Sequence, residues 1–253
     1  MQVEALVLAG GVKVDSLQEQ ASETSEALIK IGERIMVDYV VQVLNSSDEV
    51  ERIAVVGPEE LLKNYYRNSE TELLLAPPGD SPMGSVRNGM KVLSPRRMML
   101  VVTGDIPLLS VEAVQDFLDK CKGIHADLYY PIVRKETNEQ KYPGVQRTYV
   151  RLKEGTFTGG NLFLVRPEVV ESCFDQAEKL VKLRKNPLAL SKQVGLGFII
   201  KLLLHRLTMK ETEKRFSKLL GLKGVAIVSP FPEIGIDVDK PSDLELVRRV
   251  LAI

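Results

Sequence analysis

The chain has 253 residues and carries 34 basic and 34 acidic side chains, so its formal net charge is zero. A chain of this length buries a large core, and it is long for one compact domain but short for two. Without a net positive charge, no global field attracts nucleic acid. The composition therefore favours a globular protein that handles small molecules rather than nucleic acid.

Cysteine use and hydropathy indicate a cytoplasmic protein. Cys121 and Cys173 each fall within an amphipathic helical pattern, and the sequence has no CxxC motif or histidine cluster. These features favour core thiols in a reducing compartment over zinc or disulfide chemistry. The first residues show no charged-then-apolar leader, and no apolar run reaches the roughly 18 residues needed to span a bilayer.

Apolar runs typical of strands alternate with helical patterns along most of the chain. Strands are expected at 3–9, 52–57, 72–76, 97–103, 126–132, 145–152, 161–166 and 224–229. A helix is expected at 33–45, where apolar side chains recur with helical spacing. The alternation predicts βαβ units, and so one Rossmann-like domain over 1–253: a three-layer α/β/α fold with a mostly parallel sheet.

The first strand, Val3 to Ala9, is followed at once by Gly10 and Gly11. Such a strand-to-glycine junction lets backbone N–H groups approach a phosphate closely. The next basic side chains along the chain are Lys13 and Lys30. By itself this pattern is a weak indication of a phosphate site.

The central strand leads directly to a single carboxylate. The segment RMMLVVTGDIPLL (97–109) places Asp105 directly after Gly104, with Pro107 two residues further on. Ligands of open α/β sheets bind in the crevice beyond the carboxyl ends of the strands, so Asp105 is placed to hold a metal or a ligand. The structural alternative is a turn, because Gly-Asp-x-Pro is also good turn chemistry.

The C-terminal segment EIGIDVDKPSDLELVRRVL (233–251) has a short strand that ends in Asp237 and Asp239. Pro241 then opens a helix whose apolar positions share one face. Asp239 is interpreted as a helix cap. Asp237 has no such local role, so it is the better candidate for a metal ligand.

Three motifs together, LVLAGG (6–11), TGDIPLL (103–109) and GIDVDKPSDLE (235–245), resemble the nucleotidyltransferase superfamily with the glycosyltransferase-A-type fold. The resemblance is greatest to the branch with the molybdenum cofactor guanylyltransferases and the cytidylyltransferases of sugar and isoprenoid pathways. It covers about residues 1–131, 155–174 and 224–253. It implies that Asp105 and Asp237 hold Mg²⁺ (or Mn²⁺) against the phosphates of an NTP. The nucleotide would lie against Leu8, Ala9, Gly10, Gly11 and Gly104.

Two further segments agree with this resemblance. The segment PPGDSPMGSVRNGM (77–90) is similar to the family's base-recognition loop, with Gly79, Asp80, Ser81, Ser85 and Asn88 as the implied contacts. Read individually, Asp80 or Ser81 is a helix N-cap. The segment EGTFTGGNLFLV (154–165) is similar to the part that faces the acceptor, with Thr158, Gly159, Gly160 and Asn161 as the implied contacts. A hairpin turn is the alternative for these glycines.

One departure from the family pattern puts catalysis in doubt. Active members usually carry an Arg just after the glycine loop and a Lys before an Ala-Leu run. In this chain no Arg directly follows Gly11, and Glu26 stands at the position of that Lys. Nucleotidyl transfer depends on positioning and charge neutralisation, and a carboxylate repels a triphosphate. Lys30 or Lys13 are then the candidates for the missing positive charge.

Three functions therefore stay open. The first is a Mg²⁺-dependent nucleotidyltransferase that moves NMP from an NTP to a phosphate-bearing or other oxyanion acceptor and releases pyrophosphate. The second is a nucleotide-binding or regulatory protein that has lost catalysis, which Glu26 favours. The third is a nucleotide-sugar-dependent glycosyltransferase, which Thr103 disfavours because that class usually shows an Asp-x-Asp pair at this strand end.

Residues 175–222 form a helical insertion that the family core does not explain. Its apolar stripe consists of Leu196, Ile199, Ile200, Leu203, Leu204 and Leu207, widened by Phe198 and Leu202. Residues 179–210 include eight Lys or Arg and no Asp or Glu. Three interpretations stay open: a helix packed on the core with a basic rim in water, contact of 179–210 with an anionic membrane or a partly apolar phosphorylated substrate, and homodimerisation.

Overall fold

The computed structural model describes residues 1–10, 25–183 and 187–252. The predicted roles of Gly11 and Lys13 therefore lie outside the described residues. The strands are β1 (Val3–Leu8), β4 (Val50–Val56), β5 (Leu73–Ala76), β6 (Met98–Thr103), β7 (Leu128–Arg134), β8 (Val150–Leu152), β9 (Gly155–Gly159), β10 (Leu162–Val165) and β11 (Gly224–Ser229), with β2 (Lys30–Ile31) and β3 (Arg34–Ile35) in a separate hairpin.

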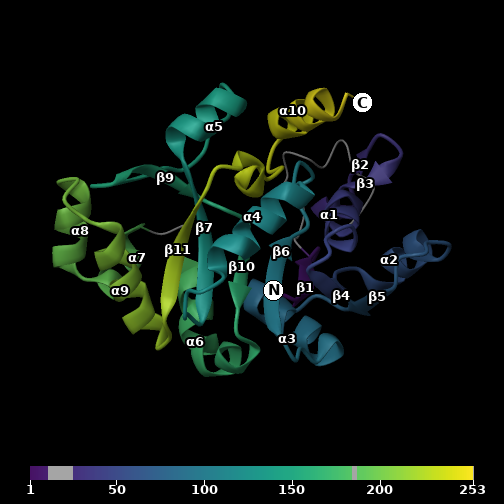
Figure 1. The fold of residues 1–253 in the computed structure, drawn as a ribbon, viewed down its shortest axis with the longest axis horizontal. Helices are drawn as coiled ribbons and strands as arrows, with labels where there is room; N and C mark the ends of the chain where they lie inside the picture. Colours follow the sequence, from purple (N-terminus) through teal and green to yellow (C-terminus); the bar gives the residue numbers. More distant parts are fainter. Residues whose placement is uncertain (11–24, 184–186, 253) are drawn as a thin grey trace.

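The helices alternate with these strands along most of the chain and pack around the sheet (Figure 1). They are α1 (Met36–Asn45), α2 (Glu59–Tyr66), α3 (Pro82–Leu93), α4 (Val111–Cys121), α5 (Lys135–Lys141), α6 (Pro167–Leu183), α7 (Pro187–Val194), α8 (Leu196–Leu203), α9 (Met209–Leu220) and α10 (Pro241–Leu251), with 3₁₀ turns η2 (Glu26–Leu28) and η3 (Pro232–Gly235). No helix in the described part of the chain is long and apolar enough to cross a membrane.

The main sheet is mostly parallel, as the sequence predicts. Strand β1 pairs in parallel with β4 on one side and β6 on the other, and β5 extends the sheet beyond β4. Strand β10 is antiparallel to β6 and β7, while β11 is parallel to β7. In register, Leu8 lies opposite both Val56 and Thr103. The carboxyl ends of β1, β4 and β6 therefore meet at one edge of the sheet, which is where ligands bind in this class of fold.

Alternation of side chains along β1 explains the three layers. Val3, Ala5 and Val7 belong to a buried cluster with residues of α1, α2 and α4. Leu6 points to the opposite face and belongs to a cluster with residues of α3 and α6. Successive side chains of a strand point to opposite faces, so a strand that is apolar throughout requires helices on both sides. This arrangement confirms the predicted α/β/α fold.

The predicted helix at 33–45 is wrong in its first turn. Residues 30–35 instead form the hairpin of β2 and β3, and Gly32 takes a left-handed φ of 60° at the turn. The helix therefore begins at Met36. The strand expected at 145–152 is likewise shorter and covers only Val150–Leu152.

The apolar stripe at 196–207 is not one continuous helix. Helix α8 ends at Leu203, and His205 has a left-handed φ of 54° that turns the chain. Leu207 then enters a small buried cluster with Leu152 and Phe157. The segment is helical from α6 to α9, although α6 begins earlier than expected, at Pro167, and its being an insertion stays a prediction.

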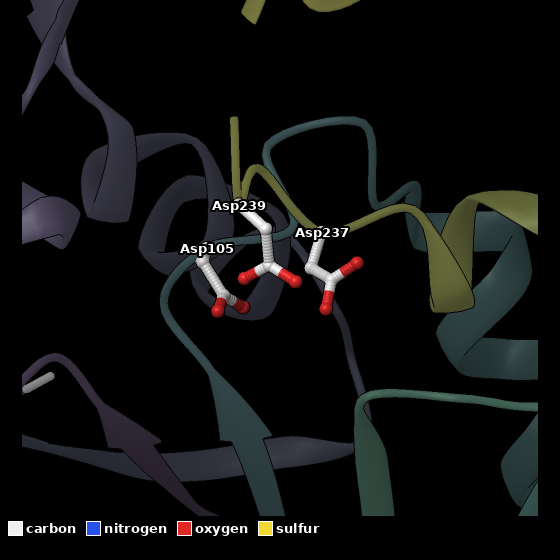
Figure 2. Close-up of side chains that lie close together, drawn as sticks. All are labelled: Asp105, Asp237 and Asp239. Carbon is white, nitrogen blue, oxygen red and sulfur yellow. The ribbon is translucent and has the colours of Figure 1, made fainter. Parts of the chain in front are cut away.

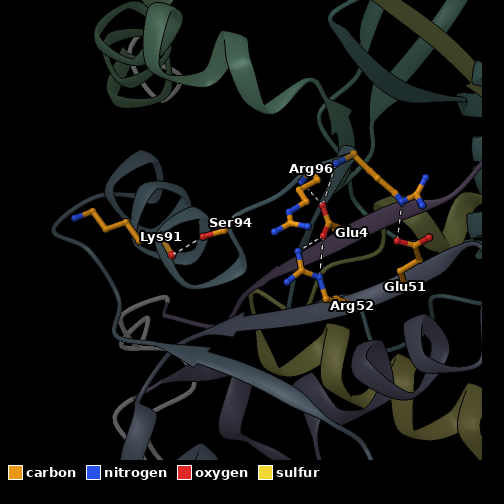
Figure 3. A network of polar contacts seen from close by, with 7 residues as sticks. Glu4, Glu51, Arg52, Lys91, Ser94 and Arg96 are labelled. Carbon is orange, nitrogen blue, oxygen red and sulfur yellow. Dashed lines mark hydrogen bonds and ion pairs between the residues drawn. The ribbon is translucent and has the colours of Figure 1, made fainter.

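An ion-pair network lies at the edge of the sheet where β1 and β6 begin, away from their carboxyl ends (Figure 3). The Glu4 carboxylate pairs with Arg52 and accepts hydrogen bonds from the backbone N–H groups of Arg96 (2.6 Å) and Arg97 (3.1 Å). Burial would raise the pKa of Glu4, but these hydrogen bonds hold it below its usual value. The network joins the starts of neighbouring strands and is structural.

Candidate functional site

Three carboxylates converge at the carboxyl end of β6. Figure 2 shows Asp105, Asp237 and Asp239 with their side chains gathered together, the last two on one extended segment. One carboxylate oxygen from each lies within 4.8 Å of the others. Residues separated by more than a hundred positions in sequence therefore form a single acidic cluster, as predicted for Asp105 and Asp237.

Buried neighbours hold Asp105 in this place. Gly104 lies between Leu8 and helix α1. Its N–H donates to the Leu8 carbonyl (2.8 Å), and a Cβ added to it would come within 3.1 Å of the Val37 side chain on α1. The Asp105 carbonyl accepts a hydrogen bond from the Val238 N–H (2.9 Å). This bond fixes the C-terminal segment directly beside the loop that follows β6.

The interpretation of Asp239 as a helix cap is wrong. Helix α10 has Lys240 at its N-cap position. Ile236 and Val238 are fully buried in the cluster that also contains residues of α10. Because side chains alternate along an extended segment, burial of these two residues turns Asp237 and Asp239 to the same side, toward Asp105. The alternation Ile-Asp-Val-Asp in the sequence could have predicted that Asp239 lies on the same side as Asp237.

The electrostatics of the cluster raise the pKa of Asp105 to about 7. Burial is the largest cause, and the negative charges of Asp237 and Asp239 add to it. The Thr103 hydroxyl donates a hydrogen bond to Asp105 Oδ1 (2.5 Å), which lowers the pKa but does not offset the other effects. Packing several carboxylates this closely is costly unless a cation compensates them.

Arg147 contributes one cation that the sequence analysis missed. It lies between α5 and β8, and its guanidinium forms an ion pair with Asp237. The Arg147 side chain is only 14% exposed, and among the described residues its Nε finds no hydrogen-bond partner. The residue is ninety positions from Asp237 and belongs to no recognisable motif, so no local signal pointed to it.

The glycine loop and the 77–90 loop are packed against each other. A Cβ on Gly10 would come within 2.6 Å of the Pro78 side chain, and one on Gly79 within 2.3 Å of the Gly84 carbonyl carbon. Real Cβ atoms do not approach other atoms this closely, so both positions require glycine. Ala9 precedes this contact and donates to the Val56 carbonyl (2.7 Å).

The polar residues of the 77–90 loop shape the loop itself. Ser81 is the N-cap of α3 and accepts from the Gly84 N–H (3.0 Å), as its alternative interpretation predicts. Ser85 Oγ accepts from the Gly79 N–H (3.0 Å), and Asn88 Nδ2 donates to the Pro77 carbonyl (3.2 Å). Asp80 is exposed. Contact of these residues with a nucleotide stays a prediction.

Asn161 links the central strand to the C-terminal segment. Its carbonyl accepts from the Thr103 N–H (3.0 Å) and its N–H donates to the Ile234 carbonyl (2.7 Å). Its side-chain Nδ2 is buried without a hydrogen-bond partner among the described residues. Of the other predicted acceptor residues, Thr158 is buried in β9, while Gly159 ends that strand and Gly160 follows it.

The segment with Glu26 lies between the glycine loop and the Asp105 loop. The Ser25 hydroxyl donates to the Ala9 carbonyl (2.7 Å), and Ala27 is 3.4 Å from the position of a Cβ on Gly104. Glu26 is buried in the first turn of η2, whereas Lys30 is exposed on the β2–β3 hairpin. Contact of either side chain with a phosphate stays a prediction.

Comparisons with known proteins give matches in both sequence and fold. Residues 5–195 match the family model of the MobA-like NTP transferase domain. A hypothetical transferase from Thermus thermophilus is 37% identical, with a TM-score of 0.84 over 96% of this chain and 100% of that one. No curated protein sequence matches the chain.

Two more distant structures share the fold. The 4-diphosphocytidyl-2C-methyl-D-erythritol synthase of Anaerococcus prevotii and a CMP-2-keto-3-deoxy-manno-octonic acid synthetase complexed with CTP each have a TM-score of 0.61 at 12% identity. The first covers 100% of this chain and 96% of its own, and the second 99% and 98%. From the family model and the Thermus relative, the chain belongs to the family of MobA-like NTP transferase domains.

Proposed function

We propose that this protein is a Mg²⁺-dependent nucleotidyltransferase that moves NMP from an NTP to a phosphate-bearing or other oxyanion acceptor. The convergence of Asp105, Asp237 and Asp239 at the carboxyl end of β6 carries this proposal. The fold family supplies the reaction class, and the acidic cluster supplies a place for the cation that the reaction needs.

The donor set fits a magnesium or manganese ion. Mg²⁺ takes oxygen ligands at about 2.0–2.1 Å, so opposite ligands are roughly 4 Å apart. The three carboxylate oxygens lie within 4.8 Å of one another, so small rotations of the side chains would bring all three to one ion. Asp105, Asp237 and Asp239 would hold the ion, and when bound it would neutralise charge on the NTP phosphates.

In the proposed reaction an acceptor oxyanion attacks the α-phosphorus of the NTP. A new oxygen–phosphorus bond forms while the bond from that phosphorus to the bridging oxygen breaks, and the bond electrons leave with pyrophosphate. The chain's part is positioning and charge compensation, which carry most of the catalysis in this class of reaction. The backbone at Gly10 would approach the phosphates, the 77–90 loop would receive the base, and Asn161 would face the acceptor.

Arg147 is our candidate for positive charge at the phosphates, because Glu26 occupies the expected lysine position. Its Nε remains an unused buried donor beside Asp237. A planar guanidinium suits a phosphate because it donates two parallel hydrogen bonds. Replacement of Arg147 by Met should weaken NTP binding by roughly 1.5–3 kcal/mol, the usual contribution of a hydrogen bond to a charged group.

The second candidate is a nucleotide-binding protein without catalysis. The buried Glu26, between the glycine loop and the Asp105 loop, is the observation that favours it. In that case NTP and Mg²⁺ would bind, but no acceptor would be modified.

Pyrophosphate release distinguishes these functions. Each of the four NTPs is incubated with the protein, Mg²⁺ and pools of small phosphorylated acceptors, and Asp105→Asn is the inactive control. We expect one NTP to give acceptor-dependent pyrophosphate that the variant does not release. NTP binding by calorimetry without any release would favour the second candidate. In a parallel incubation with nucleotide-sugars in place of the NTPs, release of a nucleoside diphosphate would indicate a glycosyltransferase.

A further inference from the structure

Helix α8 lies at one end of the molecule (Figure 1), and one side of it carries exposed apolar residues. Its inner side chains, Phe198 and Leu202, pack against the cluster of Leu152, Phe157 and Leu207. Its outer face consists of Leu196 (75% exposed), Ile200 (47%), Leu203 (71%) and Leu204 (58%). Every other exposed large hydrophobic side chain in the described residues lies between 36% and 46%. The most water-exposed apolar residues are thus concentrated on about two turns of one helix.

Basic residues lie close to this face in the sequence. Lys192, Arg206 and Lys210 are exposed, and residues 179–210 contain no Asp or Glu. The acidic residues of the neighbouring α9 already have other contacts: Glu211 pairs with Lys201 and caps its own helix, and Glu213 accepts from the Ala226 N–H (2.8 Å). The sequence that flanks the apolar face therefore carries more basic than acidic residues, although the whole chain is neutral.

We propose that the outer face of α8 docks on the surface of an anionic lipid bilayer. Leucine and isoleucine side chains on one side of a helix enter the boundary between headgroups and acyl chains, while lysine and arginine at the rim contact anionic headgroups. The helix would lie in the plane of the interface. Its short length and the absence of a spanning helix in the described residues agree with a peripheral contact.

Charge and area disfavour a second copy of the chain as the occupant. A two-fold dimer would place the basic rim of one α8 against the same rim of its partner, which repels it. A stable dimer also buries about 800 Å² on each partner, more than two turns of one helix offer.

Vesicle co-sedimentation of the full chain tests this docking. Vesicles of pure phosphatidylcholine are compared with vesicles containing phosphatidylglycerol, for wild type, Leu196→Gln/Leu203→Gln and Lys192→Glu/Arg206→Glu. Leu61→Gln/Leu74→Gln is the matched control, since these residues are also exposed, at 40% and 36%, but lie on α2 and β5. Circular dichroism verifies that every variant is folded, and light scattering gives the oligomeric state.

We expect wild type and the control to bind phosphatidylglycerol vesicles. The leucine variant should lose at least roughly tenfold in binding, because apolar burial supplies most of the insertion. The charge variant should lose the preference for anionic lipid, roughly fivefold per basic residue removed. Absence of vesicle binding would overturn the proposal, as would equal binding to both lipids. A wild-type dimer that the leucine variant converts to monomer would assign the face to self-association instead.

Discussion

The raised pKa of Asp105 predicts that cation binding depends on pH near neutrality. Asp105 has a pKa of about 7 because it is buried and close to Asp237 and Asp239. A carboxylate must lose its proton to bind a cation, so Mn²⁺ should bind better as the pH rises through this pKa. At about pH 8 roughly nine tenths of the Asp105 side chains are deprotonated, against roughly one tenth at about pH 6. Affinity should therefore fall about tenfold over this range, or about 1.4 kcal/mol.

The same pKa determines how stability changes with pH. The pKa in the folded protein lies above the ordinary carboxyl value of 3.8. Between these two values the folded state binds more protons than the unfolded state. Stability of the cation-free protein should therefore decrease as the pH rises through this window, by at most about 1.4 kcal/mol per pH unit. Excess Mn²⁺ should reduce this loss, because it binds the deprotonated folded form.

Calorimetric titration with Mn²⁺ and thermal denaturation, each across the pH range, measure both effects. Asp105→Asn should bind Mn²⁺ more weakly and show neither pH dependence. Asp127→Asn is a control, because that carboxylate lies at the opposite end of the sheet, where it accepts from the Lys223 N–H. The reasoning is refuted if wild type binds Mn²⁺ equally well at both ends of the range, or if Asp105→Asn retains the full pH dependence.

Three more predictions concern single positions. Gly79→Ala should weaken NTP binding and lower stability by about 1–3 kcal/mol, because the new Cβ would lie 2.3 Å from backbone. Gly197→Ala is the control, since its Cβ meets no atom within 4 Å, and it should change neither the calorimetric affinity nor the melting temperature. Glu4→Gln should lower the free energy of unfolding by about 1–3 kcal/mol in urea titrations. Glu51→Gln removes a more exposed ion pair and should lower it by under about 1 kcal/mol. Equal losses in the two variants would contradict a buried network. Glu26→Lys should tighten NTP binding in equilibrium titrations if the residue faces the phosphates, and unaltered affinity would place the phosphates elsewhere.

Short-range patterns predicted most of the fold. Strands with continuous apolar runs, such as β1 and β6, need only local sequence to be recognised. The hairpin at 30–35 was missed because the helical spacing of apolar residues in α1 was extended back to residue 33. Strand β9 was missed because its glycines and threonines suggest a turn, and only pairing with β7 and β8 makes it a strand.

The candidate site was predicted where its residues belong to strand ends. Asp105 and Asp237 follow apolar segments, so sequence and fold class together placed them at one edge. Asp239 was assigned to the following helix because Pro241 signals a helix start, although the buried Ile236 and Val238 decide its direction. Arg147 could not be predicted, since its contact with Asp237 depends on the folded path of a loop.

A crystal structure with Mn²⁺ and a non-hydrolysable NTP tests the central claim most directly. Anomalous scattering locates Mn²⁺ without reference to the surrounding side chains. We expect one strong peak between Asp105, Asp237 and Asp239, within ligand distance of the NTP phosphates, and no such peak in Asp105→Asn. A nucleotide bound elsewhere, or one bound at the glycine loop with its cation away from all three carboxylates, would contradict the account.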